Sequence, residues 1–523
     1  MAPLQSWIIA ETATASFGDK RLDQRFPRIL DRMSQQPALK FPAACKGDAE
    51  VQAAYRFVNN DKVDEHEVFR PHRDATIERI RKQAVVLIPQ DTTEIDVTRR
   101  HEVVTGAGPL NDAGRVGFFD HALLALTPER LPLGVVQAAI HARDFDEFAA
   151  GAAKGAAAKR AERKAKPIED KESIRWLEGY RAACRVAEEA PETTVVSLSD
   201  SEGDIFECLL EGRRVEGQRK AEWIIRACQD RALVLDGAPS GGGATSLRGR
   251  LVGAPILDRM TIEVRKREPK SKDGRKRKQP RAARTAEVTV RAARVRLRGP
   301  ARPGGKLTDV EVNAVLVREE APPPGEEPIE WILLTSLPIA TVEEVLRVVE
   351  YYCCRWQIEV YFRILKSGCK VEESQLETAE AFLPYLALCM IVAWRVQYVM
   401  MLGRDCPELP CDIAFDAEEW QSVYAVVKGC PPPAEPPSMG TMVKLIASLG
   451  GYLGRKCDGE PGPKAMWIGL RRMADLALAW RAHPAHAPGA VGRSHGSKAR
   501  RTTADGPTAP ANAPPDPPTC DTR

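Results

Sequence analysis

The sequence lacks the cysteine and histidine patterns on which zinc sites and disulfide frameworks depend. Its 13 cysteines and 8 histidines are scattered over 523 residues, and no two cysteines have the two-residue spacing of a zinc ligand pair. An odd number of cysteines without a spacing pattern indicates reduced thiols, as in a cytoplasmic protein. A zinc fold and a secreted disulfide scaffold are therefore not expected.

The sequence also has no long apolar run. The N-terminus shows no basic segment followed by an apolar one, so we expect no secretory signal. The most apolar stretch, Phe382–Val392, is about half as long as a membrane span and is closely followed by Arg395. We expect a buried helix there and no association with a membrane.

A large excess of charge of one sign is missing too, with 76 Lys and Arg against 72 Asp and Glu. The net charge of +4 does not by itself indicate nucleic acid, but the basic residues are clustered. Within Arg265–Arg284, 11 of 20 residues are Lys or Arg. A flexible surface hairpin is one interpretation, and the density of the run favours contact with a DNA backbone.

Residues 1–75 have the pattern of a small helical unit. Apolar residues recur at helical spacing after Asp19, which can cap the helix, and a second helix is expected at 49–60. A basic stripe runs beside the apolar one and consists of Arg21, Arg25, Arg28 and Arg32. This spacing suits contacts to phosphates along one side of a helix, although a solvated arginine face has the same pattern.

The following segments predict a mixed α/β layer. An antiparallel three-stranded meander is indicated by apolar runs at 85–89, 121–127 and 133–142. A helical stretch at 149–190 leads to a strand at 193–200 and a helix at 205–211. The region 221–340 is rich in strand signals, and helices follow until the tail at 483–523, whose composition predicts disorder.

Two aspartates follow apolar strands and could meet at one edge of a sheet. Asp91 comes directly after the run at 85–89, and Asp200 ends the strand at 193–200. Taken alone, each is as readily explained as a turn residue, because Asp is common at strand ends.

A third carboxylate lies in the stretch YYCCRWQIEVYFRILKSG. A capping box of Thr341 and Glu344 and a stop at Gly368 predict one long helix over 341–368. At roughly 100° per residue, a face about 80° wide holds Tyr352, Arg355, Glu359, Arg363 and Lys366. Ion pairs along a solvated face would explain these charges equally well, but not the two accompanying aspartates.

A glutamate among cations suits a site where carboxylates bind metal and basic side chains hold phosphates. We expect Asp91, Asp200 and Glu359 to hold two Mg²⁺ ions, with Mn²⁺ able to substitute, because oxygen ligands favour these metals. Two such ions can activate a water or a 3′ hydroxyl and stabilise the leaving oxygen of a phosphodiester.

The spacing of these residues resembles that of the DDE transposases of the insertion-sequence-four family, to which the transposase of transposon five belongs. The family signature reads here as Tyr352, Arg355, Glu359 and Lys366. The family's Asp-Thr-Thr element is matched from Asp91 to Thr93. Its second aspartate element is matched more loosely by DSEGD, which begins at Asp200 and has Ser201 in place of the usual arginine. The resemblance extends from about residue 6 to residue 480.

The resemblance implies an α/β protein with a ribonuclease-H-like catalytic core. The implied divisions are a helical DNA-binding domain at 1–75, two parts of the core at 76–220 and 341–378, a β-rich insertion with a basic hairpin at 221–340, a helical dimerisation region at 379–482 and the tail at 483–523. It also implies a Mg²⁺-dependent enzyme, acting as a homodimer in a paired-end complex. Such an enzyme cleaves the terminal inverted repeats of an insertion sequence and joins them to target DNA. It would work in the bacterial cytoplasm, associated with the nucleoid when bound to DNA.

The resemblance assigns further DNA contacts. Together with Arg21 and Arg25 of the basic stripe, the expected DNA-binding residues are Tyr352, Arg355, Arg363, Lys366, Arg226 and Trp331. Arg363 stands where the family has a lysine. Trp331 stands where it has a tryptophan that stacks on a flipped base, although a tryptophan in an apolar strand can also be core. Two alternatives remain open: a catalytically silent DNA-binding protein descended from a transposase, and a structure-specific nuclease with the same core.

Overall fold

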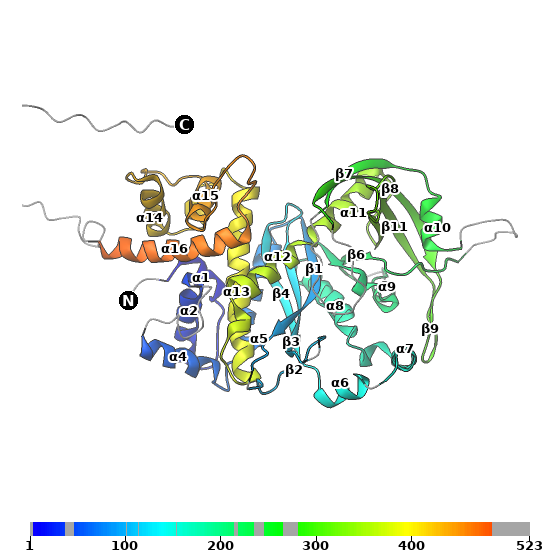
Figure 1. The fold of residues 1–523 in the computed structure, drawn as a ribbon, viewed down its shortest axis with the longest axis horizontal. Coiled ribbons are helices and arrows are strands. Elements are labelled where there is room, and N and C mark those ends of the chain that lie inside the picture. Colours follow the sequence, from blue (N-terminus) through cyan, green and yellow to red (C-terminus); the bar gives the residue numbers. More distant parts are fainter. Residues whose placement is uncertain are drawn as a thin grey trace, which may run out of the picture.

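The computed structural model describes residues 4–36, 47–100, 102–112, 114–152, 154–213, 218–234, 245–264 and 281–483. Most of the basic stretch at 265–284 and nearly all of the tail at 483–523 therefore lie outside the described residues. In Figure 1, the long helix α13 (Ala379–Asp405) stands between the sheet and a group of helices drawn from both ends of the chain.

A mixed sheet lies at the centre of the molecule. The antiparallel meander consists of β1 (Val85–Asp96), β3 (Val116–Leu126) and β4 (Pro132–His141). On the other side of β1, β5 (Thr194–Ser199) runs parallel to it, and β6 (Glu222–Arg226) runs parallel to β5. The spatial order β4-β3-β1-β5-β6 is a ribonuclease-H-like mixed α/β core, as the sequence motifs implied.

The predicted meander is confirmed, but β1 extends further than its apolar run. Parallel pairing with β5 ends at Pro89, opposite Leu198, whereas antiparallel pairing with β3 continues to Asp96. Proline has no N–H to donate to a ladder, so a strand can lose one neighbour there and keep the other. Asp91, opposite Ala122, therefore lies inside a strand and not after one, which corrects the sequence-based placement.

The sheet continues beyond β6 without a break. It is extended by antiparallel pairing through β12 (Glu330–Thr335), β11 (Val310–Arg318), β8 (Arg284–Leu297) and β7 (Asp258–Val264). Because β6 pairs with both β5 and β12, the expected division at residue 221 falls between two hydrogen-bonded strands of one sheet. Shorter elements of this region are β9 (Ala301–Arg302), β10 (Gly305–Lys306) and α10 (Leu247–Val252), while the short β2 (Gly108–Pro109) pairs with β3 at the other end of the sheet.

Helices cover both faces of the sheet. One face packs against α8 (Ile174–Glu189) and α9 (Phe206–Glu211), with α6 (Phe145–Ala152) and α7 (Ala156–Ala165) beyond the end of β4. The other face packs against α13 and the segment before it. By length and composition α13 alone among the described helices could cross a membrane, but 89% of its most apolar window is buried, as expected for 382–392. The cysteines of the described residues form no disulfides, in line with the expectation of reduced thiols.

The helix predicted over 341–368 is interrupted. The structure has α11 (Val342–Cys354), α12 (Gln357–Arg363) and a π-helical turn over Ile364–Gly368. Between α11 and α12, Arg355, Ile358 and Glu359 each donate to the carbonyl three residues earlier, so the backbone is locally wound more tightly while staying in the helical region. The prediction of one uninterrupted helix was therefore wrong, although Arg355 still hydrogen-bonds Glu359 and the predicted capping box of Thr341 and Glu344 is present.

Gly368 ends the helical segment as predicted, but not through a left-handed conformation. The left-handed residue is Lys370, with φ of 53°. A Cβ atom at Gly368 would lie 3.0 Å from the indole of Trp467, so the glycine is required for close packing of this turn on a C-terminal helix.

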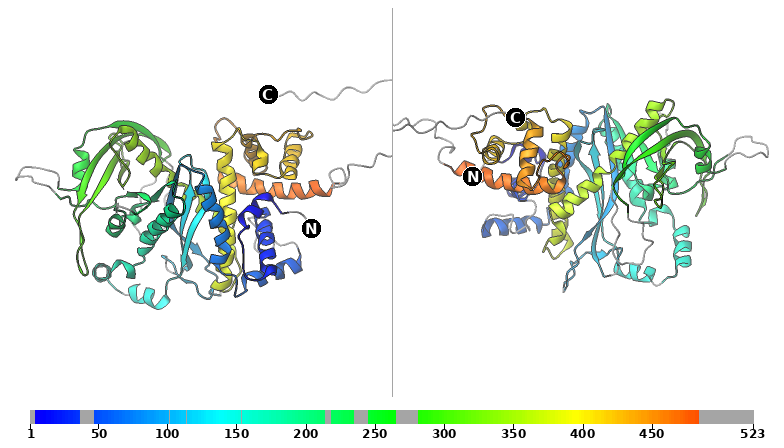
Figure 2. Two further views of the ribbon diagram at one scale, coloured as in Figure 1. Left: turned by 180° about the vertical axis from the view of Figure 1, so that it is seen from behind. Right: turned by 45° about the horizontal axis from the view of Figure 1, so that its top comes forward.

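Helices from the two ends of the chain share α13 as a packing partner. The N-terminal set is α1 (Ser6–Glu11), α2 (Lys20–Gln35), α4 (Asp48–Val58) and α5 (Glu65–Ile80), and the C-terminal set is α14 (Ala417–Lys428), α15 (Met439–Leu449) and α16 (Pro463–Ala482). Asp19 caps α2 as predicted. Figure 2 shows α2, α4 and the C-terminal set on the side of α13 away from the sheet, whereas α5 packs on both α13 and β4.

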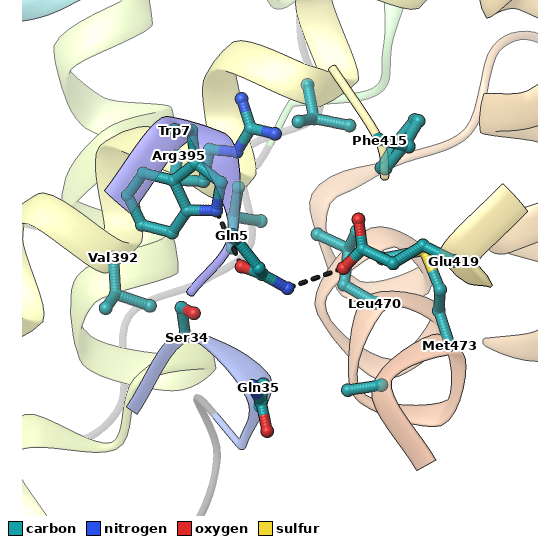
Figure 3. Close-up of a pocket in the computed structure, with 13 residues that line it drawn as sticks. Gln5, Trp7, Ser34, Gln35, Val392, Arg395, Phe415, Glu419, Leu470 and Met473 are labelled. Atoms are coloured by element: carbon teal, nitrogen blue, oxygen red, sulfur yellow. Dashed lines mark hydrogen bonds between the residues drawn. The ribbon is translucent and has the colours of Figure 1, made fainter. Parts of the chain in front are cut away.

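A small pocket marks where the two sets meet (Figure 3). Gln5 donates to Oε1 of Glu419 at 2.5 Å, and Trp7 donates to Oε1 of Gln5 at 2.7 Å. The guanidinium of Arg395, on α13, lies 5.1 Å from the Trp7 ring centroid. The first residues of the described chain are thus held by α13 and α14, which follow them by almost 400 positions in the sequence.

A buried ion pair fastens the N-terminal helices to the sheet. The backbone N–H of Val135 donates to His72 Nε2 at 3.1 Å, which leaves the proton on Nδ1 to donate to Glu11 Oε2 at 2.6 Å. Arg79 pairs with the same carboxylate, and its guanidinium lies 4.5 Å from the centroid of Trp394. One carboxylate therefore joins α1, α5 and, through His72, β4.

Removing the Glu11 carboxylate should lower the stability of the fold. We expect Glu11→Ala to lower the free energy of unfolding by about 3 kcal/mol, because breaking a buried pair leaves its partners unsatisfied. Urea denaturation measures the loss, with Glu67→Ala on the exposed side of α5 as control, where a surface pair contributes about 0.5 kcal/mol. Equal losses in the two variants would contradict the role assigned to Glu11.

Candidate active site

Asp91 and Asp200 lie at matching positions on neighbouring strands. Pro89 and Leu198 form the last parallel pair of β1 and β5, and each aspartate is two residues beyond its member of that pair. Side chains two residues apart point to the same face of a sheet, so both carboxylates face the side of the sheet that carries α12. The convergence expected from two strand-end aspartates is therefore reached, although one of them is inside its strand.

Arg355 joins the carboxylates of two different elements. Its Nη1 donates to Asp91 Oδ2 at 3.0 Å, and its Nη2 donates to Glu359 Oε1 at 2.8 Å. The Arg355 side chain is 13% exposed, and those of Asp91 and Glu359 are 20% and 33% exposed. These charge-assisted hydrogen bonds place a single cation between acids that β1 and α12 supply.

The charges of Asp200 and Glu359 both act on Asp91. Burial raises the pKa of Asp91 to about 6, with Arg355 lowering it and the charges of Asp200 and Glu359 raising it. Asp200 also accepts a hydrogen bond from the backbone N–H of Glu202 at 2.7 Å, which fixes its side chain at the start of the turn after β5. Like charges gathered around one cation form a site that requires compensating positive charge.

The donor atoms fit a divalent metal in type. Asp91, Asp200 and Glu359 offer carboxylate oxygens, which Mg²⁺ and Mn²⁺ prefer. In the described part of the chain, no three His, Cys, Asp or Glu side chains are grouped closely enough to hold a metal, and the Arg355 guanidinium stands between two of the acids. The guanidinium of Arg355 thus supplies positive charge between two of the acids, where a bound metal ion would otherwise supply it.

A second cluster lies beside the acids and unites three predicted DNA-binding residues. The Tyr352 and Trp331 rings meet edge to face, with centroids 5.8 Å apart. Arg226, on β6, is near enough to act on Tyr352: burial raises the pKa of that tyrosine, whereas the charges of Arg355 and Arg226 lower it. Trp331 is half-buried, so it is neither sealed in the core nor free on the surface.

Lys366 lies near acids that sequence reasoning did not single out. Its amine is 3.6 Å from Glu372 Oε1, and the same oxygen accepts the backbone N–H of Asp96 at 3.1 Å. The charge of Lys366 also reaches Asp120, a fully buried residue of β3 whose carboxylate oxygens have no hydrogen-bond partner among the described residues. No periodicity identifies Asp120, because it occupies an apolar run.

Asp120 gives a pH-dependent prediction. Burial raises its pKa to about 7, so the stability it contributes is fully present below the usual pKa near 4 and is lost as the pH rises through 7. We expect Asp120→Asn to stabilise the protein by roughly 4 kcal/mol at pH 8 relative to its effect at pH 4, since each unit of the pKa difference is worth about 1.4 kcal/mol. Urea denaturation at the two pH values measures this, and a pH-independent effect would refute the raised pKa.

The remaining predicted residues are divided between α12 and α2. Arg363 is exposed on α12, four residues after Glu359. Arg21 pairs with Asp19 at 3.0 Å, and Arg25 is half-exposed with no ion pair in the described residues. Both belong to α2, on the far side of α13 from the sheet (Figure 1), so they do not line the acidic site.

The last acid of the DSEGD element has a different position from the first. Asp204 is buried, pairs with Arg231 and accepts the backbone N–H groups of Cys228 and Gln229 at 2.9 and 3.2 Å. It ties the turn after β5 to the segment after β6. Asp204 therefore holds together the two loops that follow Asp200 and Arg226.

Family models match three segments of the sequence. A transposase DNA-binding model matches residues 4–63, a transposase DDE domain model matches 213–395, and a transposase Tn5 dimerisation domain model matches 391–485. Glu359 lies within the matched DDE segment, whereas Asp91 and Asp200 precede it. A cryo-EM structure of the piggyBac transposase synaptic complex with hairpin DNA matches 76% of this chain and 72% of that chain at 9% identity, with a TM-score of 0.32 too low to support an argument.

A ribonuclease-H-like core joined to DNA-binding and dimerisation domains defines a DDE transposase, a class of enzymes that act on DNA. The chain belongs to the Tn5-like DDE transposases, which confirms the family resemblance of the sequence motif.

Proposed function

We propose that the protein is a Mg²⁺-dependent cut-and-paste transposase in which Asp91, Asp200 and Glu359 hold the metal ions. The observation that carries this proposal is the Arg355 guanidinium, which hydrogen-bonds the carboxylates of Asp91 on β1 and Glu359 on α12 and also lies in the electrostatic field of Asp200 at the end of β5. When bound, two Mg²⁺ ions, or Mn²⁺ in their place, would activate a water or a 3′ hydroxyl and stabilise the leaving oxygen.

The residues around the acids would position the DNA strand. Arg355 would leave the carboxylates and bind a phosphate beside the cut, because a guanidinium can bind either group with two hydrogen bonds. Lys366 and Arg363 would bind neighbouring phosphates. Tyr352 and Arg226 would hold one side of the strand, and the half-buried Trp331 would receive an unstacked base.

The other parts of the chain would assemble the substrate. Residues 1–75 would bind the terminal inverted repeats through Arg21 and Arg25, and the basic stretch in the 221–340 insertion would contact the DNA backbone. The helices of 379–482 would join two copies around paired ends. Residues 76–220 and 341–378 would form the catalytic core, in the cytoplasm of a bacterium.

The direct test uses DNA that carries the inverted repeats flanking the gene. Incubation with Mg²⁺ should give cleaved ends and products joined to target DNA. Binding without cleavage would indicate the catalytically silent alternative, and cleavage without joining would indicate a structure-specific nuclease.

A further inference from the structure

A buried chain of polar side chains crosses the sheet directly behind the acids. It consists of Thr92 and Gln90 on β1, His121 on β3 and Ser197 on β5. His121 is completely buried, and Gln90 and Ser197 are each 3% exposed. These side chains face α8, whereas Asp91, between Gln90 and Thr92, faces the opposite side of the sheet.

The donor and the acceptor of each hydrogen bond among these four side chains can be assigned without conflict. The amide oxygen of Gln90 can only accept, so His121 Nε2, 3.0 Å away, carries the proton. Burial lowers the pKa of His121 to about 3, and the ring is therefore neutral and accepts at Nδ1 from the Thr92 hydroxyl at 2.8 Å. Gln90 Nε2 then donates to Ser197 Oγ at 3.1 Å.

Helix α8 packs closely against these four hydrogen-bonded side chains, with a glycine at the point of closest approach. A Cβ atom at Gly179 would lie 2.2 Å from Gln90 Oε1 and 3.0 Å from His121 Nε2. The Trp176 ring meets the imidazole edge to face, with centroids 4.9 Å apart. The polar side chains thus lie in a fitted slot, in which the rotamers of Gln90 and His121 are restricted.

These side chains add a link between β1 and β5 at the end of their backbone ladder. Parallel pairing of β1 with β5 ends at Pro89, which has no N–H to donate. The next residue, Gln90, reaches back with its side chain to Ser197, which lies within the ladder opposite Ile88 and three positions before Asp200. Since Gln90 and Thr92 are both anchored, the backbone of Asp91 is clamped on either side.

We infer that Thr92, His121, Gln90 and Ser197 are positioning residues that fix the separation of Asp91 and Asp200, and with it the affinity of the acidic site for a divalent cation. This inference rests on the proposed function, since it concerns the metal site assigned there. None of the four side chains reaches the acidic face itself. They act through the strands that carry the two aspartates, as partners behind metal ligands commonly do.

The test titrates the full-length protein with Mn²⁺ alone, followed by electron paramagnetic resonance at pH 8. Thr92→Val and Ser197→Ala remove one hydroxyl each with little change of volume. Each should weaken Mn²⁺ binding by about tenfold, the lower end of the range for residues that orient metal ligands. Gly179→Ala, which inserts a methyl group between Gln90 and His121, should weaken it as well.

The matched control is Thr193→Val, at the other end of the β5 segment. The Thr193 hydroxyl is fully buried and donates to the carbonyls of Ile80 and Gln83. Its removal therefore tests the effect of losing a buried hydroxyl without altering the hydrogen bonds of Thr92, His121, Gln90 and Ser197. Thermal unfolding of each variant separates a general loss of stability from a change at the site. Unchanged Mn²⁺ binding in Thr92→Val and Ser197→Ala would overturn the inference alone, whereas failure of the wild-type protein to bind Mn²⁺ would overturn the proposed function with it.

Discussion

Glu359→Gln is expected to reduce cleavage of element-end DNA by about 10⁴-fold, the scale observed when one member of a jointly acting catalytic set is removed. The substitution preserves the shape of the side chain and an oxygen that can still accept from Arg355, so the local fold should persist. It removes a negative charge and a metal-binding oxygen from the acidic site. End binding, which involves residues on the far side of α13, should remain within about twofold.

Single-turnover cleavage and gel-shift binding with the same DNA measure the two effects. Glu350→Gln is the matched control, because Glu350 is an exposed residue of α11 that is absent from the contacts around the acids. Wild-type rates of cleavage in Glu359→Gln would remove Glu359 from the proposed metal site.

Arg355→Gln is expected to strengthen Mn²⁺ binding to the DNA-free protein by at least about tenfold. A unit charge about 4 Å away contributes on the order of 4 kcal/mol at an effective dielectric constant of 20, and partial exposure reduces that value. In the wild-type protein, the guanidinium competes with a metal for Asp91 and Glu359. The variant should nevertheless cleave DNA poorly, because it has lost a proposed phosphate ligand.

The measurement is calorimetric titration with Mn²⁺ at pH 8, where Asp91, with a pKa of about 6, is ionised. Arg347→Gln, an exposed charge on α11, controls for the change in net charge. If DNA draws Arg355 away from the acids, DNA should also raise the metal affinity of the wild-type protein more than that of the variant. Equal metal affinities of the DNA-free wild-type protein and Arg355→Gln would contradict the competition.

The sequence predicted the acids better than it predicted their surroundings. Asp91 and Asp200 could be singled out because apolar runs precede them. Glu359 could be singled out because a helical projection groups it with basic residues, and the short interruption between α11 and α12 changes that grouping little. The tight turn at Arg355 could not be predicted, since it depends on how α12 packs against the sheet. The projection therefore placed Arg355 beside Glu359 without revealing that it also reaches Asp91.

The residues that sequence analysis missed are those whose roles depend on pairing between strands. His121 and Asp120 lie in a run that is otherwise apolar, so only the register of β3 with β1 places them opposite Thr92 and Thr93. Glu372 contacts Lys366 because a left-handed residue, Lys370, turns the chain back. The continuity of the sheet from β5 through β6 to β12 was also hidden, because strand signals do not specify partners.

The packing of both chain ends on α13 has a consequence for synthesis. Gln5 and Glu419, which are hydrogen-bonded to each other, are 414 residues apart in the sequence. At 5–20 residues per second, a ribosome needs roughly 20–80 s to make the partner after the first helices have emerged. Phe26 can pack at once on Phe17 and Phe57, but the side of α2 that contacts α13 and α16 stays uncovered until those helices are made, so the nascent N-terminal segment exposes apolar surface for all of that time.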